Sequence, residues 1–312
     1  MTINEHIEEF GGLPIVEYTR GADLPTSVLP AVRLSLDWDA TESGDSFADL
    51  FASLLDHPSS GEIRALVIGD WGQAGGGADS SAVVEALVSG RDRLPNLVAL
   101  FLGEMTVEES EISWILQSDV SPLFAAFPKL EELWIRGGSD LSLGRPQHDR
   151  LRKLVIETGG LSRTVVREIA SAALPALEHL ELWLGDEGYG NDILVGDLDP
   201  LLAAGKFPRL RYLGLRDDCD ADLTAALIAK LGLPPTVEVL DLSLGTLSDE
   251  GAKALAAWPG IRNLKKLDIH HHYVGTEVVK RLRSFLAELD ATDAKEPDDW
   301  DGEPHRYVAV SE

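Results

Sequence analysis

The feature that most constrains the fold of this chain is a short apolar pattern, apolar-x-x-Leu-x-apolar, that returns along most of its length. It occurs as AVRLSL (31–36), IRALVI (63–68), LVALFL (97–102), LEELWI (130–135), LRKLVI (151–156), LEHLEL (177–182), LRYLGL (210–215), VEVLDL (237–242) and LKKLDI (264–269). Successive central leucines are 32, 34, 33, 21, 26, 33, 27 and 27 residues apart. A repeat of this length predicts a solenoid, because no single unit can bury its apolar face alone and stacked units share one core.

Each repeat is predicted to supply a short strand whose Leu-x-apolar pair points into the core, then a turn and a returning helix. Helical spacing of apolar residues is found in segments 45–57, 79–93, 161–173, 221–232, 247–260 and 275–289. The connector 137–148, GGSDLSLGRPQH, lacks this spacing and is expected to be irregular. The fold class is therefore α/β, a solenoid of about nine repeats in a horseshoe, with a parallel sheet on the concave side and helices on the convex side.

Two terminal regions differ from the repeats. Residues 1–30 are expected to form an N-terminal cap, since the first repeat would otherwise expose its core, and residues 31–289 form the solenoid. Residues 290–312 form an acidic tail that contains Trp300, Tyr307 and Val308. Its composition leaves two arrangements open, a tail folded back over the last repeat or one that dangles freely.

The charge of the chain restricts its partners. It has 53 acidic and 27 basic residues and a formal net charge of −26, which disfavours nucleic acid and anionic membrane surfaces and suits a basic protein or peptide. The acidic N-terminus does not resemble a signal peptide, no apolar run matches a membrane span, and Cys219 is the sole cysteine. We therefore expect a soluble cytoplasmic protein, with no disulfide and no cofactor, in which acidic neighbours suppress the reactivity of the Cys219 thiol.

The repeat spacing resembles that of the longer, helix-bearing leucine-rich repeat proteins of the ribonuclease-inhibitor class. The chain departs from that class at the position where an asparagine often ends the strand, because glycine, aspartate or other residues stand there, and glycine-assisted turns are expected instead. The segments GDWG, EISWILQSDV, ELWLG, LDLSLGTLSDEGA, LDIHHHYV and RYVAVSE are similar to an uncharacterised family of bacterial leucine-rich repeat proteins. That resemblance implies the fold and carries over no catalytic residue.

Residues that alternate with the core leucines are expected to line the concave surface. Large aromatic side chains with charged neighbours gather on its middle strands, which is the composition of a protein-interaction hot spot. The predicted partner-binding residues are Phe101, Trp134, Arg136, Glu157, Glu181, Trp183, Tyr212, Arg216 and Asp241. The competing interpretation is that these rings pack on one another and on the termini.

The segment LDIHHHY offers a second candidate site. If the strand continued past the core residues, Asp268, His270 and His272 would alternate onto one face and could bind a divalent metal. Parallel side chains on one strand rarely converge on one ion, so hydrogen bonding at the edge of the last repeat is the alternative interpretation.

These observations favour a non-enzymatic module that binds a protein or peptide, possibly basic, on its concave face. The alternative is a metal-binding enzyme or accessory subunit that uses Asp268, His270 and His272. A third function, regulation of a small GTPase, is known for some helix-bearing repeat proteins, but no residue pattern here specifically indicates it.

Overall fold

The structure is a computed structural model that describes residues 3–25, 29–36, 38–72, 77–300 and 302–311. Within these residues the chain forms two compact units. The N-terminal unit contains residues 3–157 and 171–174, and the C-terminal unit contains residues 158–170 and 175–311.

The N-terminal unit is built on strands β1 (Glu9–Phe10), β2 (Leu13–Glu17), β3 (Ala31–Leu36), β4 (Ala65–Trp71), β5 (Ala99–Leu102), β6 (Glu132–Arg136) and β7 (Lys153–Glu157). They follow one another in the sheet in chain order, with β1 antiparallel to β2 and the later strands parallel. From β4 to β7 the predicted central leucines pair in register, as Leu100 with Leu133. The first repeat is offset, because Leu34 pairs with Ile68 and not with Leu66.

The helical segments of this unit are α1 (Trp38–Glu42), α2 (Phe47–Asp56), η1 (Ser60–Glu62), α3 (Ser81–Gly90), η2 (Arg91–Arg93), η3 (Ile112–Trp114) and α4 (Pro122–Ala126). Helix α2 begins where Ser46 accepts a hydrogen bond from the Asp49 N–H, a standard N-terminal cap. The helices expected in 45–57 and 79–93 are confirmed. Segment 137–148 contains no helix and forms isolated bridges, as its composition predicts.

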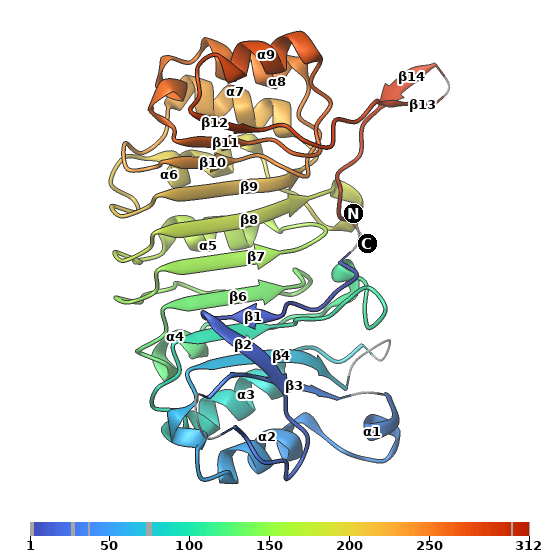
Figure 1. Cartoon of the computed structure of the whole chain (residues 1–312), viewed down its shortest axis with the longest axis vertical. Helices are drawn as coiled ribbons and strands as arrows, with labels where there is room; N and C mark the ends of the chain where they lie inside the picture. Colours follow the sequence, from blue (N-terminus) through green and yellow to red (C-terminus); the bar gives the residue numbers. More distant parts are fainter. Residues whose placement is uncertain (1–2, 26–28, 37, 73–76, 301, 312) are drawn as a thin grey trace. The chain divides into compact units, whose positions relative to one another are not determined.

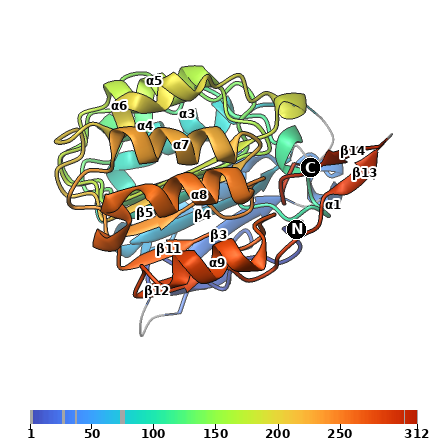
Figure 2. The same cartoon turned by 90° about the horizontal axis from the view of Figure 1, so that it is seen from above.

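The C-terminal unit contains the parallel strands β8 (His179–Gly185), β9 (Tyr212–Asp218), β10 (Val239–Asp241), β11 (Lys266–Asp268) and β12 (Glu288–Asp290). Its helical segments are η4 (Glu187–Tyr189), η5 (Val195–Leu198), α6 (Asp199–Leu202), α7 (Ala221–Leu231), α8 (Asp249–Ala257), η6 (Pro259–Asn263) and α9 (Thr276–Arg283), and α5 (Arg163–Ser171) begins in this unit. In each unit the longer helices, such as α2 and α3 or α7 and α8, lie on one side of the sheet (Figures 1 and 2). This arrangement is an α/β leucine-rich repeat solenoid, as the sequence predicted.

The last repeat differs from the prediction. The helix expected over 275–289 ends at Arg283, and residues 288–290 instead form β12, where Leu289 pairs with Leu267. The Glu-Leu-Asp of β12 repeats the Val-Leu-Asp of β10 and the Lys-Leu-Asp of β11. A tenth copy of the pattern is therefore present, 22 residues after the ninth central leucine.

A residue with positive φ ends or follows strands in both units. It is a glycine at Gly103, Gly137 and Gly185, with φ of 88°, 94° and 73°. In the later repeats the same left-handed position is taken by larger residues, including Leu244 (φ 68°) and His271 (φ 56°). The expectation of glycine-assisted turns thus holds in the first part of the chain, whereas non-glycine residues adopt the strained conformation after β10 and β11.

The C-terminal tail runs along the turns that follow β9, β10 and β11. The N–H of Val310 donates to Asp217 Oδ1 at 2.9 Å, and the N–H of Ala309 donates to the Leu244 carbonyl at 2.7 Å. Val310 is buried, at 3% exposure. Before this docked segment, strands β13 (Asp298–Trp300) and β14 (Glu303–His305) form a hairpin that projects from the unit (Figure 1).

The N-terminal region expected as a cap, 1–30, supplies β1 and β2, and residues 1–2 and 26–28 of it lie outside the described residues. Strand β2 pairs with β3 and so covers the edge of the first repeat strand. Within the described part of the chain, no helix has the length and apolar character needed to cross a membrane.

Candidate functional site

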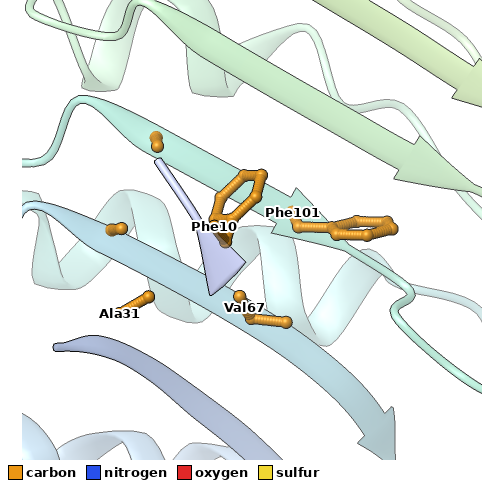
Figure 3. Close-up of a cluster of buried hydrophobic side chains, with 6 residues drawn as sticks. Phe10, Ala31, Val67 and Phe101 are labelled. Carbon is orange, nitrogen blue, oxygen red and sulfur yellow. The ribbon is translucent and has the colours of Figure 1, made fainter. Parts of the chain in front are cut away.

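The inner face of each sheet, the face turned away from the helices, carries the predicted partner-binding residues. In the N-terminal unit this face is covered by the chain's own N-terminal segment, residues 3–12. The Phe10 ring packs on Phe101, with centroids 5.8 Å apart (Figure 3). Its centroid lies 6.1 Å from that of Trp134. Phe101 is fully buried and offers no surface to a partner, so the interpretation that its ring packs on a terminus is the one observed.

Small side chains on adjacent strands make room for this segment. Ala31, Ala65 and Ala99 lie beneath Phe10 and the turn that follows it. Gly11 approaches so closely that a Cβ there would lie 2.9 Å from the Ala99 Cβ and 3.2 Å from the Ala65 Cβ. Only a glycine at this turn and small residues below it allow the backbone to lie flat on the sheet.

Polar contacts fix the same segment at its beginning. His6 Nδ1 lies 3.0 Å from Glu104 Oε2, and the Ile7 N–H donates to Glu104 Oε1 at 3.2 Å. Glu104 is fully buried and also accepts a hydrogen bond from Arg33 Nε at 2.8 Å. The N–H of Val107 donates to the carbonyl of Ile3 at 2.8 Å. Apolar contacts and polar contacts together hold this segment on the inner face, where an external ligand would otherwise bind.

The other predicted residues of this unit also have partners within the chain. Arg136 and Glu157 form a buried ion pair at 2.7 Å, and Arg136 Nη1 donates to the Met105 carbonyl at 2.6 Å. Trp134 Nε1 donates to Glu132 Oε1 at 2.8 Å, and Lys153 Nζ lies 4.5 Å from the Trp134 ring centroid. The Trp134 ring and the ion pair of this face are thus engaged by contacts within the chain.

The inner face of the C-terminal unit holds the remaining predicted residues. Glu181 lies at the centre of a network, where it accepts hydrogen bonds from Arg216 Nη1 at 2.6 Å and Trp183 Nε1 at 2.9 Å. His179 Nε2 lies 3.1 Å from the same carboxylate. Although burial opposes ionisation of Glu181, its partners His179, Arg216 and Trp183 together lower its pKa to about 2. This carboxylate therefore stays charged at neutral pH.

Tyr212 and Asp241 continue the network on the adjacent strands. The Tyr212 hydroxyl donates to Asp241 Oδ2 at 2.6 Å, and its ring stacks on His179 with centroids 3.9 Å apart and planes 5° apart. Burial, together with the charges of Glu181 and Asp241, raises the pKa of Tyr212, so the hydroxyl remains a donor. Arg216 links the two carboxylates, with Nε 3.5 Å from Asp241 Oδ2. The structure thus brings together five of the predicted partner-binding residues, Glu181, Trp183, Tyr212, Arg216 and Asp241.

The histidine segment is arranged differently from the prediction. His271 takes a left-handed conformation (φ 56°), so the alternation of side chains ends there and His272 turns inward, at 1% exposure. His272 Nε2 lies 3.2 Å from the Ala291 carbonyl, and its Nδ1 accepts from the Val274 N–H at 2.9 Å. The predicted grouping of Asp268, His270 and His272 is therefore wrong, and His272 has the hydrogen-bonding role of the alternative interpretation.

Asp290 of β12 takes the place expected for His272. Asp268, His270 and Asp290 each offer a ligand atom within 4.8 Å of the other two. Asp268 already accepts from His270 Nδ1 at 2.7 Å and pairs with Lys266 Nζ at 3.0 Å. These contacts outweigh the burial of Asp268 and lower its pKa to about 2, while the carboxylate raises the pKa of His270. A metal ion would have to compete with the Lys266 ammonium and the His270 ring for the Asp268 carboxylate.

Cys219 lies at the end of β9, outside the inner-face networks. Burial, followed in size by the charges of Asp218 and Asp220, raises the pKa of its thiol to about 12. The sequence prediction of an unreactive thiol in an acidic setting is confirmed in direction. At neutral pH the Cys219 thiol therefore stays protonated.

Sequence reasoning left two features of these faces as open alternatives and missed a third. Packing of the rings on a terminus and folding back of the tail were each one of two interpretations, and the contacts of Phe10 and of Val310 with Asp217 select between them. Asp290 was missed, although the tenth copy of the repeat signals it.

A solved structure is similar in fold to most of the chain. The crystal structure of a protein from Bacteroides fragilis is similar with a TM-score of 0.80 and 29% sequence identity, covering 91% of this chain and 78% of that chain. An internalin from Listeria monocytogenes aligns with a TM-score of 0.40 and 14% identity, over 83% of this chain and 71% of that chain. No family model and no curated protein sequence matches the chain.

Proposed function

We propose that the chain is a non-enzymatic protein-interaction module, and that the inner face of its C-terminal unit binds an extended protein or peptide segment with basic side chains. The observation that carries this proposal is the difference between the two inner faces. In the N-terminal unit an extended segment already lies on the sheet. In the C-terminal unit no described helix or strand of that unit lies over the corresponding face (Figure 1).

The N-terminal segment indicates how such a face binds an extended chain. One aromatic ring, Phe10, fills the centre, while Glu104 accepts from both a side chain and a backbone N–H of the segment. Aromatic anchors with charged surroundings are the usual composition of a protein-interaction hot spot. The C-terminal face offers the same composition, with the half-buried ring pair of Tyr212 and His179 beside the Glu181 network.

The charge of the C-terminal inner face favours a basic ligand. Its carboxylates are Glu181, Asp241, Asp268, Glu288 and Asp290, and its permanent cations are Arg216 and Lys266. The first three carboxylates are buried within the networks, whereas the Glu288 side chain is 66% exposed on β12. An arginine or lysine of a partner would meet this excess of negative charge, which accelerates association and selects against acidic segments.

A peptide-display experiment tests this proposal. Random peptides of about twelve residues are panned against the full chain, and the most enriched peptide is titrated by calorimetry. We expect Lys and Arg to be enriched. Tyr212→Ala should weaken binding of that peptide at least about tenfold, because it removes the ring of the anchor.

Charge reversal supplies a matched control. Glu288→Lys, on the proposed face, should weaken binding about threefold or more at low salt. Glu277→Lys changes the net charge equally on an 86% exposed side chain of α9 and should have no effect. Enriched peptides without basic residues, or equal affinities for both variants, would remove the assignment of this face.

A further inference from the structure

The tail hairpin, β13 and β14, is the second surface of the C-terminal unit that has the features of an interaction site. It extends away from the sheet and helices of its unit in both views (Figures 1 and 2). All the residues of its two strands are exposed, and Trp300 is 64% exposed. A tryptophan is an unusual residue to leave in water, since burial of an aromatic ring is strongly favourable.

The hairpin is held at both ends. Before it, the Lys295 N–H donates to the His272 carbonyl at 2.7 Å. After it, the Tyr307 N–H donates to the Tyr273 hydroxyl at 2.9 Å, and Arg306 Nη1 donates to Asp222 Oδ2 at 2.8 Å. An isolated hairpin with three-residue strands is marginal in water, and these anchors restrict its conformations at a fixed place on the unit.

The pairing of its strands defines the hairpin. Strand pairs join Asp298 to His305 and Trp300 to Glu303. Gly302, which precedes β14, has φ of 84°, and its N–H donates to Asp299 Oδ1 at 2.8 Å. Trp300 is therefore presented at the end of a paired strand.

Acidic residues are neighbours of Trp300 in the hairpin. Asp298 and Asp299 precede Trp300 on β13, and Glu303 is its cross-strand partner on β14. The only aromatic ring near the indole among the described contacts is His305, at 5.9 Å between centroids. An indole face with carboxylates beside it attracts a guanidinium in two ways, by cation–π contact and by ion pairing.

We propose that this hairpin is a docking element for a basic segment of a partner protein, in which arginine side chains stack on Trp300 and pair with Asp298, Asp299 and Glu303. The surface is separate from the inner face of the C-terminal unit. Charge complementarity commits the occupant to a basic polypeptide, and arginine suits the indole better than lysine because its planar group can also stack.

Calorimetric titration of the full chain with a hexa-arginine peptide tests the proposal at about 50 mM and about 200 mM salt. Trp300→Ala should weaken binding about three- to fivefold, and Trp300→Phe should retain most of the affinity. Hexa-lysine should bind the wild-type chain more weakly than hexa-arginine. Equal affinity of the wild-type chain and Trp300→Ala for hexa-arginine would overturn the proposal.

A matched pair of double variants separates the hairpin from general charge attraction. Asp298→Asn with Asp299→Asn removes two acids from the hairpin, whereas Asp56→Asn with Asp92→Asn removes two acids whose side chains are each 86% exposed in the N-terminal unit. Only the hairpin pair should weaken hexa-arginine binding; equal weakening would contradict the proposal. Sedimentation of the wild-type chain and of Trp300→Ala tests whether a second copy of the chain occupies the hairpin. If the wild-type chain self-associates and Trp300→Ala does not, the hairpin binds a second copy, and the proposal of a basic partner is overturned.

Discussion

Replacement of Phe10 by alanine tests how firmly the N-terminal segment covers the inner face of its unit. The Phe10 ring is 3% exposed and contacts two other aromatic rings, Phe101 and Trp134. The variant would leave the sheet intact but remove the one aromatic group of the segment that fills the space above Ala65 and Ala99. The perturbation is therefore specific to the cover.

The expected loss follows from the contacts. Burial of a phenylalanine side chain contributes roughly 1.5–3 kcal/mol, and each well-placed aromatic pair adds about 0.5–1.5 kcal/mol. Truncation of a buried phenylalanine to alanine typically costs about 3–5 kcal/mol in all. We expect the free energy of unfolding to fall by about 3 kcal/mol.

Urea denaturation and hydrogen exchange measure the two parts of this effect. The Ile7 N–H, bonded to Glu104, and the Ile15 N–H, bonded to the Glu8 carbonyl, should exchange faster in Phe10→Ala. Trp114→Ala is the control, because that side chain is 72% exposed in the same unit and should change stability by less than about 0.5 kcal/mol. A loss below about 1 kcal/mol for Phe10→Ala, with unchanged exchange, would refute the reasoning.

Two further predictions concern buried strain and charge. Burial, reinforced by the charges of Asp220 and Asp222, raises the pKa of Asp218 from 3.8 to about 6. Between these two pH values the folded state binds more protons than the unfolded state, so the wild-type chain loses stability as the pH rises through this window. In paired urea titrations, the stability of Asp218→Asn relative to wild type should rise by roughly 2 kcal/mol from pH 4 to pH 7, and a constant difference would contradict this. Gly137→Ala should lower the free energy of unfolding by roughly 2–4 kcal/mol, because φ is +94° and the new Cβ would lie 2.5 Å from the Ile115 carbonyl oxygen. Gly21→Ala, where φ is +76° and no atom lies within 4 Å of the new Cβ, should lower it by about 1 kcal/mol. Thermal unfolding measures both losses, and equal losses would exclude the steric contribution at Gly137.

The strands of the repeats were predictable because each one carries its own apolar pattern in a short stretch of sequence. The leucine that enters the core and the apolar residue two positions later are needed in every stacked strand. The repeat can therefore be recognised even though the residues at other positions differ from one repeat to the next. The boundary of the last helix was not predictable in the same way. Segment 284–290 continues an apolar spacing that suits a helix, and the strand around Leu289 forms because β11 offers it an edge.

The inner-face residues were predictable as a group, but their exposure was not. Glu181, Trp183 and Arg216 were placed together by the alternation of side chains alone. The burial of Phe101 depends on Phe10, which lies 91 residues earlier in the chain, and no local pattern states which surface a terminal segment will cover. His272 was misplaced because a left-handed residue other than glycine, His271, ended the alternation.

The docked tail changes how the C-terminal unit should unfold. In a simple repeat array each unit contacts only its neighbours, so the terminal repeat can fray first while the others stay folded. Here Val310 donates to Asp217 across 93 residues of chain, and Ala309 donates to Leu244. Fraying of the last repeat would pull on contacts made by earlier ones, and a chain cut after residue 305 would lose this coupling. The tail thus converts a linear stack of repeats into a segment that melts as one cooperative block.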